Sequence, residues 1–165
     1  FTYELLPTIV EKLQPMEEAE PDIALPAAKP AVNDRQAKLA QFAASEAQSL
    51  ELVENINYTT GAWEVPDDAR ATLDQIAATM QQYSELSLKI SSHTDARGPE
   101  KDNLALSKKR AEAALQYLQQ QGIAPGRLSS EGLGESQLIN RCKDGVECPD
   151  EEHAKNRRTE FRFSR

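Results

Sequence analysis

Residues 86–122 read LSLKISSHTDARGPEKDNLALSKKRAEAALQYLQQQG and contain the most regular pattern in the chain. Apolar and polar side chains alternate from residue 86 to residue 91, which is the period of a half-buried strand. A helix is predicted from about residue 102 to residue 121, ending before Gly122, because apolar side chains recur there at helical spacing. The helix side chains expected to face inward are Leu104, Ala111, Ala114, Leu115 and Leu118.

Weaker patterns on both sides complete the set of predicted elements. A first strand over about residues 52–58 precedes a helix that has Pro66 near its first turn. A third strand is predicted around residues 127–133, followed by a polar loop, a short helical turn and a last strand that turns Phe161 and Phe163 inward. This order is typical of an α/β (α+β) fold. We expect a small mixed sheet of about four strands with two main helices packed on it, and an antiparallel last strand because no long helix precedes it.

Proline and glycine divide the chain into regions. Five of the nine prolines lie within the first thirty residues, and all seven glycines lie at or after Gly61. We therefore predict an extended, acidic, proline-rich linker over residues 1–32, a short amphipathic helix over residues 33–50 and a folded domain over residues 51–165. Since the chain starts with Phe1 instead of methionine, we expect that a preceding segment, with any membrane anchor, lies outside it.

Composition argues against several classes of function. The chain has 165 residues, with 27 acidic and 19 basic side chains and a net charge of −8. This balance argues against nucleic-acid binding, because phosphate recognition depends on clustered lysine and arginine. No apolar run reaches the ~18 residues of a membrane-spanning helix. The sequence has no nucleophile-elbow motif and no phosphate-binding glycine loop, so we expect neither enzymatic activity nor a cofactor.

The polar residues that follow the second predicted strand form the candidate binding site. Asp95 lies at the carboxyl end of this strand, where ligands gather in open sheets. Asn103 and Arg110 are seven residues apart on the following helix and therefore share one stripe of its surface. An arginine fork binds a carboxylate and an aspartate binds an ammonium group, so this set suits a zwitterionic ligand. The alternative is that Asp95 and Arg110 only pair with each other or with surface neighbours.

Two motifs carry a family resemblance. They are His93-Thr94-Asp95-Ala96-Arg97-Gly98 and Asn103-Leu104-Ala105-Leu106-Ser107-Lys108-Lys109-Arg110-Ala111. Both resemble the signature of the OmpA-like C-terminal domain, the peptidoglycan-associating module of Gram-negative envelope proteins. The resemblance covers about residues 51–165 and continues in order through Tyr117-Leu118, Gly122-Ile123, Arg127-Leu128, Gly132-Leu133-Gly134-Glu135 and Asn156-Arg157-Arg158-Thr159-Glu160-Phe161. The segment between Cys142 and Cys148 resembles the form common in Bacteroidetes-type outer-membrane proteins.

The resemblance implies an OmpA-like sandwich of βαβαβ(α)β order and a function without catalysis. That function is non-covalent binding of the peptidoglycan stem peptide, chiefly its diaminopimelate residue. It implies a periplasmic module that ties an outer-membrane protein or lipoprotein to the cell wall. By motif, Asp95 and Arg110 would hold the amino-acid end of diaminopimelate, and the residues lining or supporting the pocket would be Thr94, Asn103, Arg157 and Asn156.

A second hypothesis is an envelope protein-interaction domain with a vestigial ligand site. It rests on two departures from the usual pattern of the family. Ser92 stands where glycine is common before the His-Thr-Asp triplet, and Leu133 stands where tyrosine is common in the third strand.

Several other residues have alternative interpretations. Cys142 and Cys148 could bind zinc together with His153, but structural zinc needs four ligands, so we predict a disulfide in an oxidising envelope compartment and no metal site. His93 is interpreted as a residue that caps or orients the loop after the second strand, rather than as a catalytic base. Trp63 is interpreted as a core side chain, with a sugar-stacking platform as the alternative.

Overall fold

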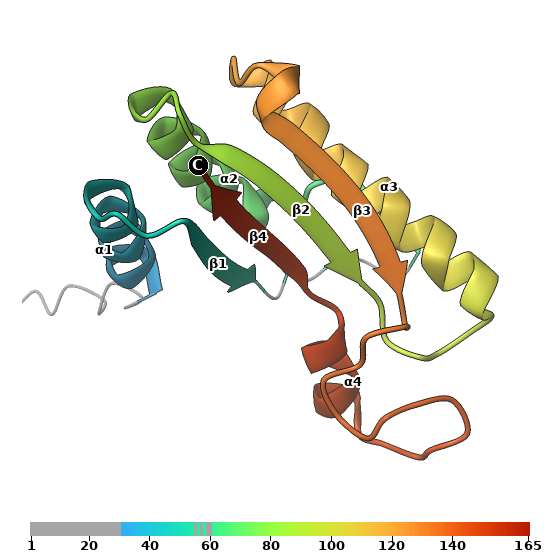
Figure 1. Cartoon of the computed structure of the whole chain (residues 1–165). Helices are drawn as coiled ribbons and strands as arrows, with labels where there is room; N and C mark the ends of the chain where they lie inside the picture. Colours follow the sequence, from blue (N-terminus) through green and yellow to red (C-terminus); the bar gives the residue numbers. More distant parts are fainter. Residues whose placement is uncertain (1–30, 55, 57, 59–60) are drawn as a thin grey trace, which may run out of the picture.

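The computed structural model describes residues 31–54, 56, 58 and 61–165 (Figure 1). The elements in chain order are α1 (Ala31–Ala44), β1 (Ser49–Glu54), α2 (Asp67–Gln82), β2 (Ser87–His93), α3 (Glu100–Gln120), the 3-10 turn η1 (Pro125–Arg127), β3 (Leu128–Gly134), α4 (Asp150–Asn156) and β4 (Thr159–Ser164). No described helix has the length and hydropathy that crossing a membrane requires. Residues 1–30 of the predicted linker lie outside the described residues, so the linker stays a prediction.

The four strands form one open mixed sheet in the order β1-β4-β2-β3. β4 pairs antiparallel with both β1 and β2, whereas β2 and β3 are parallel. The predicted mixed sheet and its antiparallel last strand are therefore confirmed. The central place of β4 was not predicted. Phe161 of this strand lies opposite Leu52 of β1 and Ile90 of β2, so its ring is surrounded by apolar neighbours on both sides.

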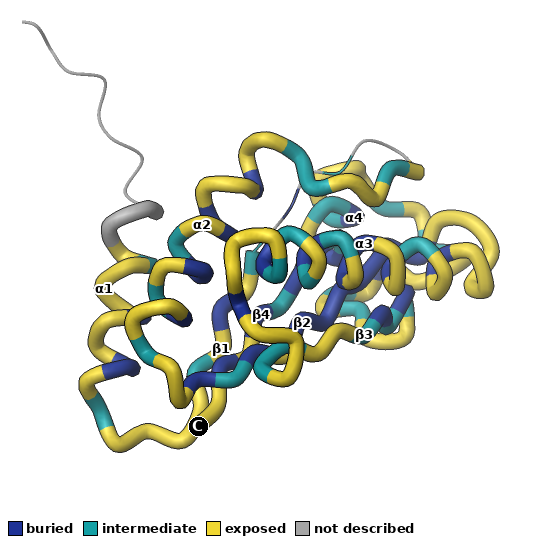
Figure 2. Tube along the Cα trace, turned by 90° about the horizontal axis from the view of Figure 1, so that it is seen from above, coloured by how far each residue is buried: buried dark blue, intermediate teal, exposed yellow. Residues whose placement is uncertain are grey.

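The hydrophobic core lies between the sheet and helices α2 and α3, which cover the same face (Figures 1 and 2). This arrangement confirms the two main helices expected on the sheet. The side chains at the centre of the core are at most 1% exposed: Leu88, Ile90, Phe161 and Phe163 from the strands, Leu73, Ile76 and Met80 from α2, and Ala111, Ala114 and Leu118 from α3.

A glycine in β3 allows α3 to lie directly against the sheet. A Cβ atom on Gly132 would lie 2.5 Å from the Cα of Lys108 and from the carbonyl carbon of Ser107, and closer still to the backbone nitrogen of Lys108. The backbone nitrogen of Gly134 donates a 2.8 Å hydrogen bond to the buried hydroxyl of Ser107. These contacts fix the position of α3 relative to the carboxyl ends of β2 and β3, and therefore fix where its polar residues lie.

The helix expected over residues 33–50 is wrong at both ends. α1 spans Ala31–Ala44 and ends where the backbone nitrogen and the hydroxyl of Ser45 both donate to the carbonyl of Phe42, at 3.0 and 2.8 Å. Leu50 belongs to β1 instead, because its backbone pairs with β4. The helix also contributes the buried ring of Phe42 to the core, so it packs as part of the fold.

Two smaller expectations about the elements are also wrong. Ile56 and Tyr58, which the sequence pattern places in the first strand, follow the end of β1. Leu104, expected to face inward from α3, is 38% exposed. The inward face of this half of α3 carries the buried polar side chains of Ser107, which accepts a hydrogen bond from Gly134 of β3, and Arg110, which borders a polar pocket.

The predicted disulfide between Cys142 and Cys148 is present in the loop between β3 and α4. Replacing both cysteines with serine is expected to lower the free energy of unfolding by about 2 kcal/mol, because the unfolded chain gains conformational freedom without the cross-link. Urea unfolding under non-reducing conditions measures the difference. A double variant as stable as the wild type would contradict this expectation.

Candidate functional site

A polar pocket of about 320 Å³ lies at the carboxyl end of β2, beside the first turns of α3 and α4. Five of the six residues predicted to form the ligand site line it: Thr94, Asp95, Asn103, Arg110 and Arg157. The other lining residues are Tyr58, Gly61, Arg97, Leu106 and Asp150. The structure therefore brings the predicted residues together around one hollow, while their role as ligands stays a prediction.

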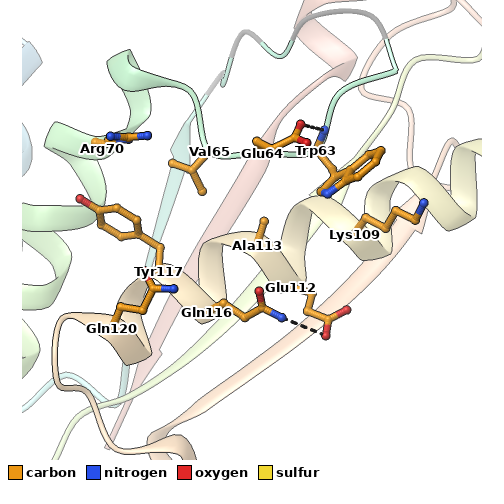
Figure 3. A pocket seen from close by; sticks show the side chains of 10 residues that line it. All are labelled: Trp63, Glu64, Val65, Arg70, Lys109, Glu112, Ala113, Gln116, Tyr117 and Gln120. Carbon is orange, nitrogen blue, oxygen red and sulfur yellow. Dashed lines mark hydrogen bonds between the residues drawn. The ribbon is translucent and has the colours of Figure 1, made fainter.

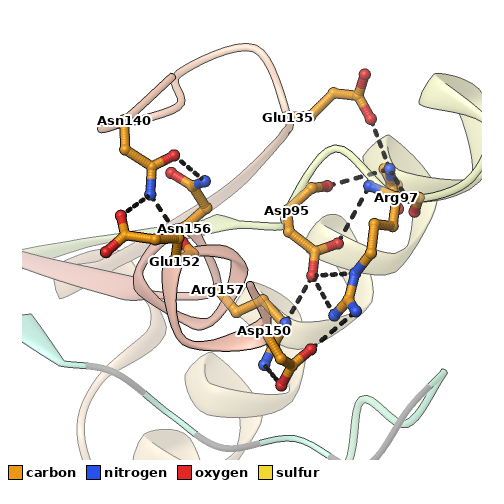
Figure 4. Close-up of polar contacts among 9 residues, drawn as sticks. Asp95, Arg97, Glu135, Asn140, Asp150, Glu152, Asn156 and Arg157 are labelled. Carbon is orange, nitrogen blue, oxygen red and sulfur yellow. Dashed lines mark hydrogen bonds and ion pairs between the residues drawn. The ribbon is translucent and has the colours of Figure 1, made fainter. Parts of the chain in front are cut away.

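Asp95 is buried and held by two arginines (Figure 4). Its Oδ2 accepts hydrogen bonds from Nε and Nη2 of Arg97, at 3.1 and 2.8 Å, and from Nη1 of Arg157 at 2.6 Å. Burial alone would raise the pKa of the Asp95 carboxyl, but the hydrogen bonds from Arg97 and Arg157 outweigh it and hold this pKa below its usual value. The side chain is therefore an ionised carboxylate at neutral pH.

Arg110 points into the same pocket from α3 and is only 3% exposed. Its Nε donates a 2.9 Å hydrogen bond to the carbonyl of Ala62, and its guanidinium carbon lies 4.2 Å from the centre of the Tyr58 ring. Burial lowers the pKa of Arg110, and the nearby Arg157 lowers it further, yet an arginine remains charged at neutral pH. No hydrogen bond joins either Nη atom of Arg110 to another of the described residues, so this end of the fork faces the pocket.

Thr94 and Asn103 differ in how their polar groups are used. Thr94 is 2% exposed, and its hydroxyl has no hydrogen-bond partner within the described part of the chain. Nδ2 of Asn103 donates to the backbone carbonyls of Asp95 and Arg97, both at 3.2 Å, and to Oε2 of Glu135 at 2.6 Å. Asn103 therefore holds the loop in place, whereas the Thr94 hydroxyl is a buried polar group that a ligand can satisfy.

Asn156 lies outside the pocket wall and supports the loop that carries the disulfide. Its Oδ1 accepts a 2.9 Å hydrogen bond from the backbone nitrogen of Ile139, and its Nδ2 donates to Oδ1 of Asn140 at 2.7 Å (Figure 4). The side chain is fully buried. Asn156 thus joins the end of α4, next to Arg157, to this loop, and its role in supporting a bound ligand stays a prediction.

The pocket carries a net positive charge in a chain of net charge −8. Three guanidinium groups line it, from Arg97, Arg110 and Arg157, against the two carboxylates of Asp95 and Asp150. Sequence reasoning missed Arg97 and Asp150 as site residues. Arg97 had a local signal, since it follows Asp95 by two positions in the same turn, but Asp150 comes from a distant element and had none.

The sequence profile of the OmpA family matches residues 57–152, more than half of the chain. The chain belongs to the OmpA family. Among curated proteins this OmpA-family chain is similar to the "Peptidoglycan-associated lipoprotein" of Mesorhizobium japonicum, with 30% identity over 96 residues that cover 58% of this chain and 57% of that protein. The chain spans about half the length of the curated relatives it matches.

Solved structures of other OmpA-like proteins show the same fold. A putative MotB-like protein from Desulfovibrio vulgaris superposes with a TM-score of 0.64 at 25% identity, covering 82% of this chain and 90% of that one. The peptidoglycan-associated lipoprotein from Burkholderia pseudomallei gives a TM-score of 0.57 at 24% identity, covering 72% of this chain and 91% of that one. The resemblance to the OmpA-like domain is therefore confirmed, whereas the Bacteroidetes-type assignment stays a prediction.

His93 of this OmpA-family domain does not cap the binding loop. The side chain is 1% exposed, and neither ring nitrogen has a hydrogen-bond partner in the ranges that the structure describes. Its Nε2 lies 3.4 Å from Oε1 of Glu160, which also binds Arg158. Burial lowers the pKa of His93 and the charge of Arg158 lowers it further, against the opposing effect of Glu160. His93 is therefore a buried neutral side chain at the carboxyl end of β2, close to the pocket but not part of its lining.

This burial predicts a pH-dependent stability. Unfolded His93 titrates at about 6.5, and the folded side chain titrates lower, so the unfolded chain binds more protons as the pH falls through about 6.5. The free energy of unfolding should therefore decrease as the pH is lowered from 7.5 to 5. Glutamine does not titrate in this range, so the free energy of unfolding of His93→Gln should decrease less over the same pH change. Urea unfolding at the two pH values measures both decreases. Equal decreases in both proteins would show that His93 is not the cause.

Arg97 offers a direct measurement of the charge on Asp95. In Arg97→Ala, Asp95 loses two side-chain hydrogen bonds and one neighbouring positive charge, so its carboxyl pKa should rise from its lowered value. Carboxyl ¹³C NMR during a pH titration measures this change. Arg162→Ala, which removes a guanidinium that binds Glu51 on the open face of the sheet, is the matched control and should leave the pKa of Asp95 unchanged.

Trp63, expected in the core, is 41% exposed instead. It lies in the segment between β1 and α2, and the ammonium of Lys109 sits 4.4 Å from the centre of its ring. The ring is therefore left on the surface, next to the pocket.

Proposed function

We propose that this domain binds peptidoglycan non-covalently and so anchors an outer-membrane protein to the cell wall. The observation that supports this function best is the convergence on one pocket of the Asp95 carboxylate and the Arg110 guanidinium, whose Nη atoms have no hydrogen-bond partner among the described residues. The names of the curated relatives, "Peptidoglycan-associated lipoprotein", support the same function. The groups in the pocket are suited to holding a charged ligand without changing it.

The ligand we propose is the diaminopimelate residue of the stem peptide. The free end of diaminopimelate carries one carboxylate and one ammonium group. The Nη atoms of Arg110 can donate to the carboxylate, and the pocket's positive charge favours it. Asp95 can accept from the ammonium by sharing its oxygens with Arg97 and Arg157. The hydroxyl of Thr94, which has no partner among the described residues, can bind either group.

Neither of the two departures from the family pattern lines this pocket. The hydroxyl of buried Ser92 is 3.0 Å from that of Thr159, the residue opposite it on β4. Leu133 is half-buried on β3 and does not line the pocket. They therefore give little support to the alternative of a protein-interaction domain with a vestigial site. That alternative retains one supporting observation, because Asp95 already has two arginine partners.

A pair of stem tripeptides tests the proposed ligand. One carries diaminopimelate as its third residue and the other carries lysine, which lacks only the terminal carboxylate. The diaminopimelate peptide should bind at least tenfold more tightly in calorimetry and should shift the NMR amide signals of Thr94, Asp95 and Asn103. Equal affinities would contradict recognition of the zwitterion, and the absence of any binding would favour the protein-interaction alternative.

We further propose that the domain works in the periplasm, attached to the outer membrane. Its disulfide is of the kind that persists in oxidising compartments, and its relatives include proteins named "Peptidoglycan-associated lipoprotein" and "Outer membrane porin F". In this proposal any membrane contact is made by a part of the protein outside this chain, and the residues before α1 act as the tether. Outer-membrane proteins or lipoproteins are the other expected partners.

A further inference from the structure

A second hollow lies beside the pocket and has no role in the function proposed so far. It is a groove of about 460 Å³ between residues 63–70 and α3 (Figure 3). The half-exposed ring of Trp63 forms one end, with the ammonium of Lys109 stacked on it. The backbone of this end is fixed, because the carbonyl of the preceding Ala62 accepts the hydrogen bond from Arg110.

The groove and the pocket share one helix. Leu106 and Arg110 of α3 line the pocket, and Ala113, Gln116 and Gln120 line the groove. Residues 106–120 of a helix extend over about 21 Å, so the two hollows follow one another along α3. The chain at Ala62 lies against the helix between them, where its carbonyl accepts from Arg110. A single extended ligand that runs over this segment can contact both hollows.

The chemistry of the groove differs from that of the pocket. Its charged side chains balance, with Arg70 and Lys109 against Glu64 and Glu112, so it suits a neutral ligand. Its remaining polar groups are chiefly amides, such as Gln116. An aromatic face supplies a surface for the C–H face of a sugar ring, while amides and carboxylates can bind hydroxyl and N-acetyl groups. These are the groups that a neutral N-acetylated sugar chain presents.

We propose that this groove binds the glycan strand of peptidoglycan, with Trp63 as the stacking surface; the proposal rests on the stem-peptide function of the adjacent pocket. Two stem residues separate diaminopimelate from the sugar, and they extend over about 7 Å. Trp63 directly follows the residue that contacts Arg110, so the groove starts within this reach. The peptide pocket and the groove together form one site for a glycan with its attached peptide.

The experiment compares three ligands by calorimetry: the diaminopimelate tripeptide, the same tripeptide on its disaccharide, and a peptide-free glycan oligosaccharide. Wild type should bind the disaccharide form about tenfold more tightly than the tripeptide, a difference of about 1.4 kcal/mol. Trp63→Ala should lose this gain and keep the wild-type affinity for the tripeptide. Trp63→Phe should keep most of it, and Val53→Ala, which removes another exposed apolar side chain on the open face of the sheet, should keep all of it.

The outcomes separate the two proposals. If wild type binds both peptide ligands equally, or if Trp63→Ala weakens both by the same factor, the glycan proposal is wrong while the stem-peptide function stands. If no peptide ligand binds, the stem-peptide function fails. Binding of the oligosaccharide by wild type, lost in Trp63→Ala, would then still support a sugar site in the groove, and no binding of any ligand would overturn both proposals.

Discussion

Arg110→Ala is expected to reduce the amount of this domain that sediments with purified sacculi by at least tenfold. The guanidinium is the group in the pocket whose Nη atoms have no partner among the described residues, and a hydrogen bond to a charged group contributes about 1.5–3 kcal/mol, a factor of roughly 10 to 100 in affinity. Co-sedimentation over a range of domain concentrations gives the affinity directly.

A second variant separates lost binding from lost folding. Arg110 also contacts Ala62 and the ring of Tyr58, so truncation to alanine removes structural contacts as well. Arg110→Lys keeps the charge but not the fork that matches a carboxylate, and it should also bind weakly while the domain remains folded by circular dichroism. Arg162→Ala removes an exposed arginine elsewhere and should sediment normally. Normal sedimentation of Arg110→Lys would show that the fork does not bind the ligand.

Gly132→Ala is expected to lower the free energy of unfolding by about 3 kcal/mol or more, because the added methyl group overlaps the backbone of α3. Its Cβ would lie 2.5 Å from the Cα of Lys108, and backbone atoms cannot move aside as a flexible side chain can. The helix must shift as a whole, which moves Asn103 and Arg110 away from the pocket. Urea unfolding measures the stability, and sacculus binding should fall in parallel.

Gly126→Ala is the matched control for this change. A Cβ at Gly126 meets nothing within 4 Å, and its φ lies outside the left-handed region that favours glycine. The variant should differ from wild type by at most about 1 kcal/mol, and in the stabilising direction if the unfolded chain loses freedom. If Gly132→Ala were as stable as Gly126→Ala, the close packing of α3 on β3 would not be a requirement of the fold.

Elements whose sequence patterns depend only on neighbouring residues could be predicted, whereas pairings between distant residues could not. The alternation in β2 and the helical spacing in α2 and α3 depend on neighbouring residues, and these elements were predicted correctly. The insertion of β4 between β1 and β2 depends on pairing between residues more than seventy positions apart, such as Ile90 and Phe161, and no local pattern encodes it. The sequence analysis placed the end of α1 too late, because Leu50 continues the helical spacing of the apolar residues before it and can equally belong to a strand.

In the candidate site, too, residue positions could be predicted from local patterns, whereas side-chain contacts could not. Asp95 and Arg110 could be placed from one strand end and one helix stripe, and the structure brings both to one pocket. The ion pairs that Asp95 makes with Arg97 and Arg157, and the hydrogen bond from Asn103 to Glu135, depend on side-chain directions that spacing does not fix. Trp63 was misassigned because aromatic character predicts burial only on average.

The position of β4 also sets the order in which this domain can assemble. Among the described strands, β1 is hydrogen-bonded only to β4, and β2 is joined to β1 only through β4. A nascent chain that has left the ribosome or a translocation channel only as far as α4 therefore contains β1 and β2 without the strand that joins them in the sheet. The four-stranded sheet can therefore be completed only after residues 159–164 have emerged, although they are the last strand of the chain.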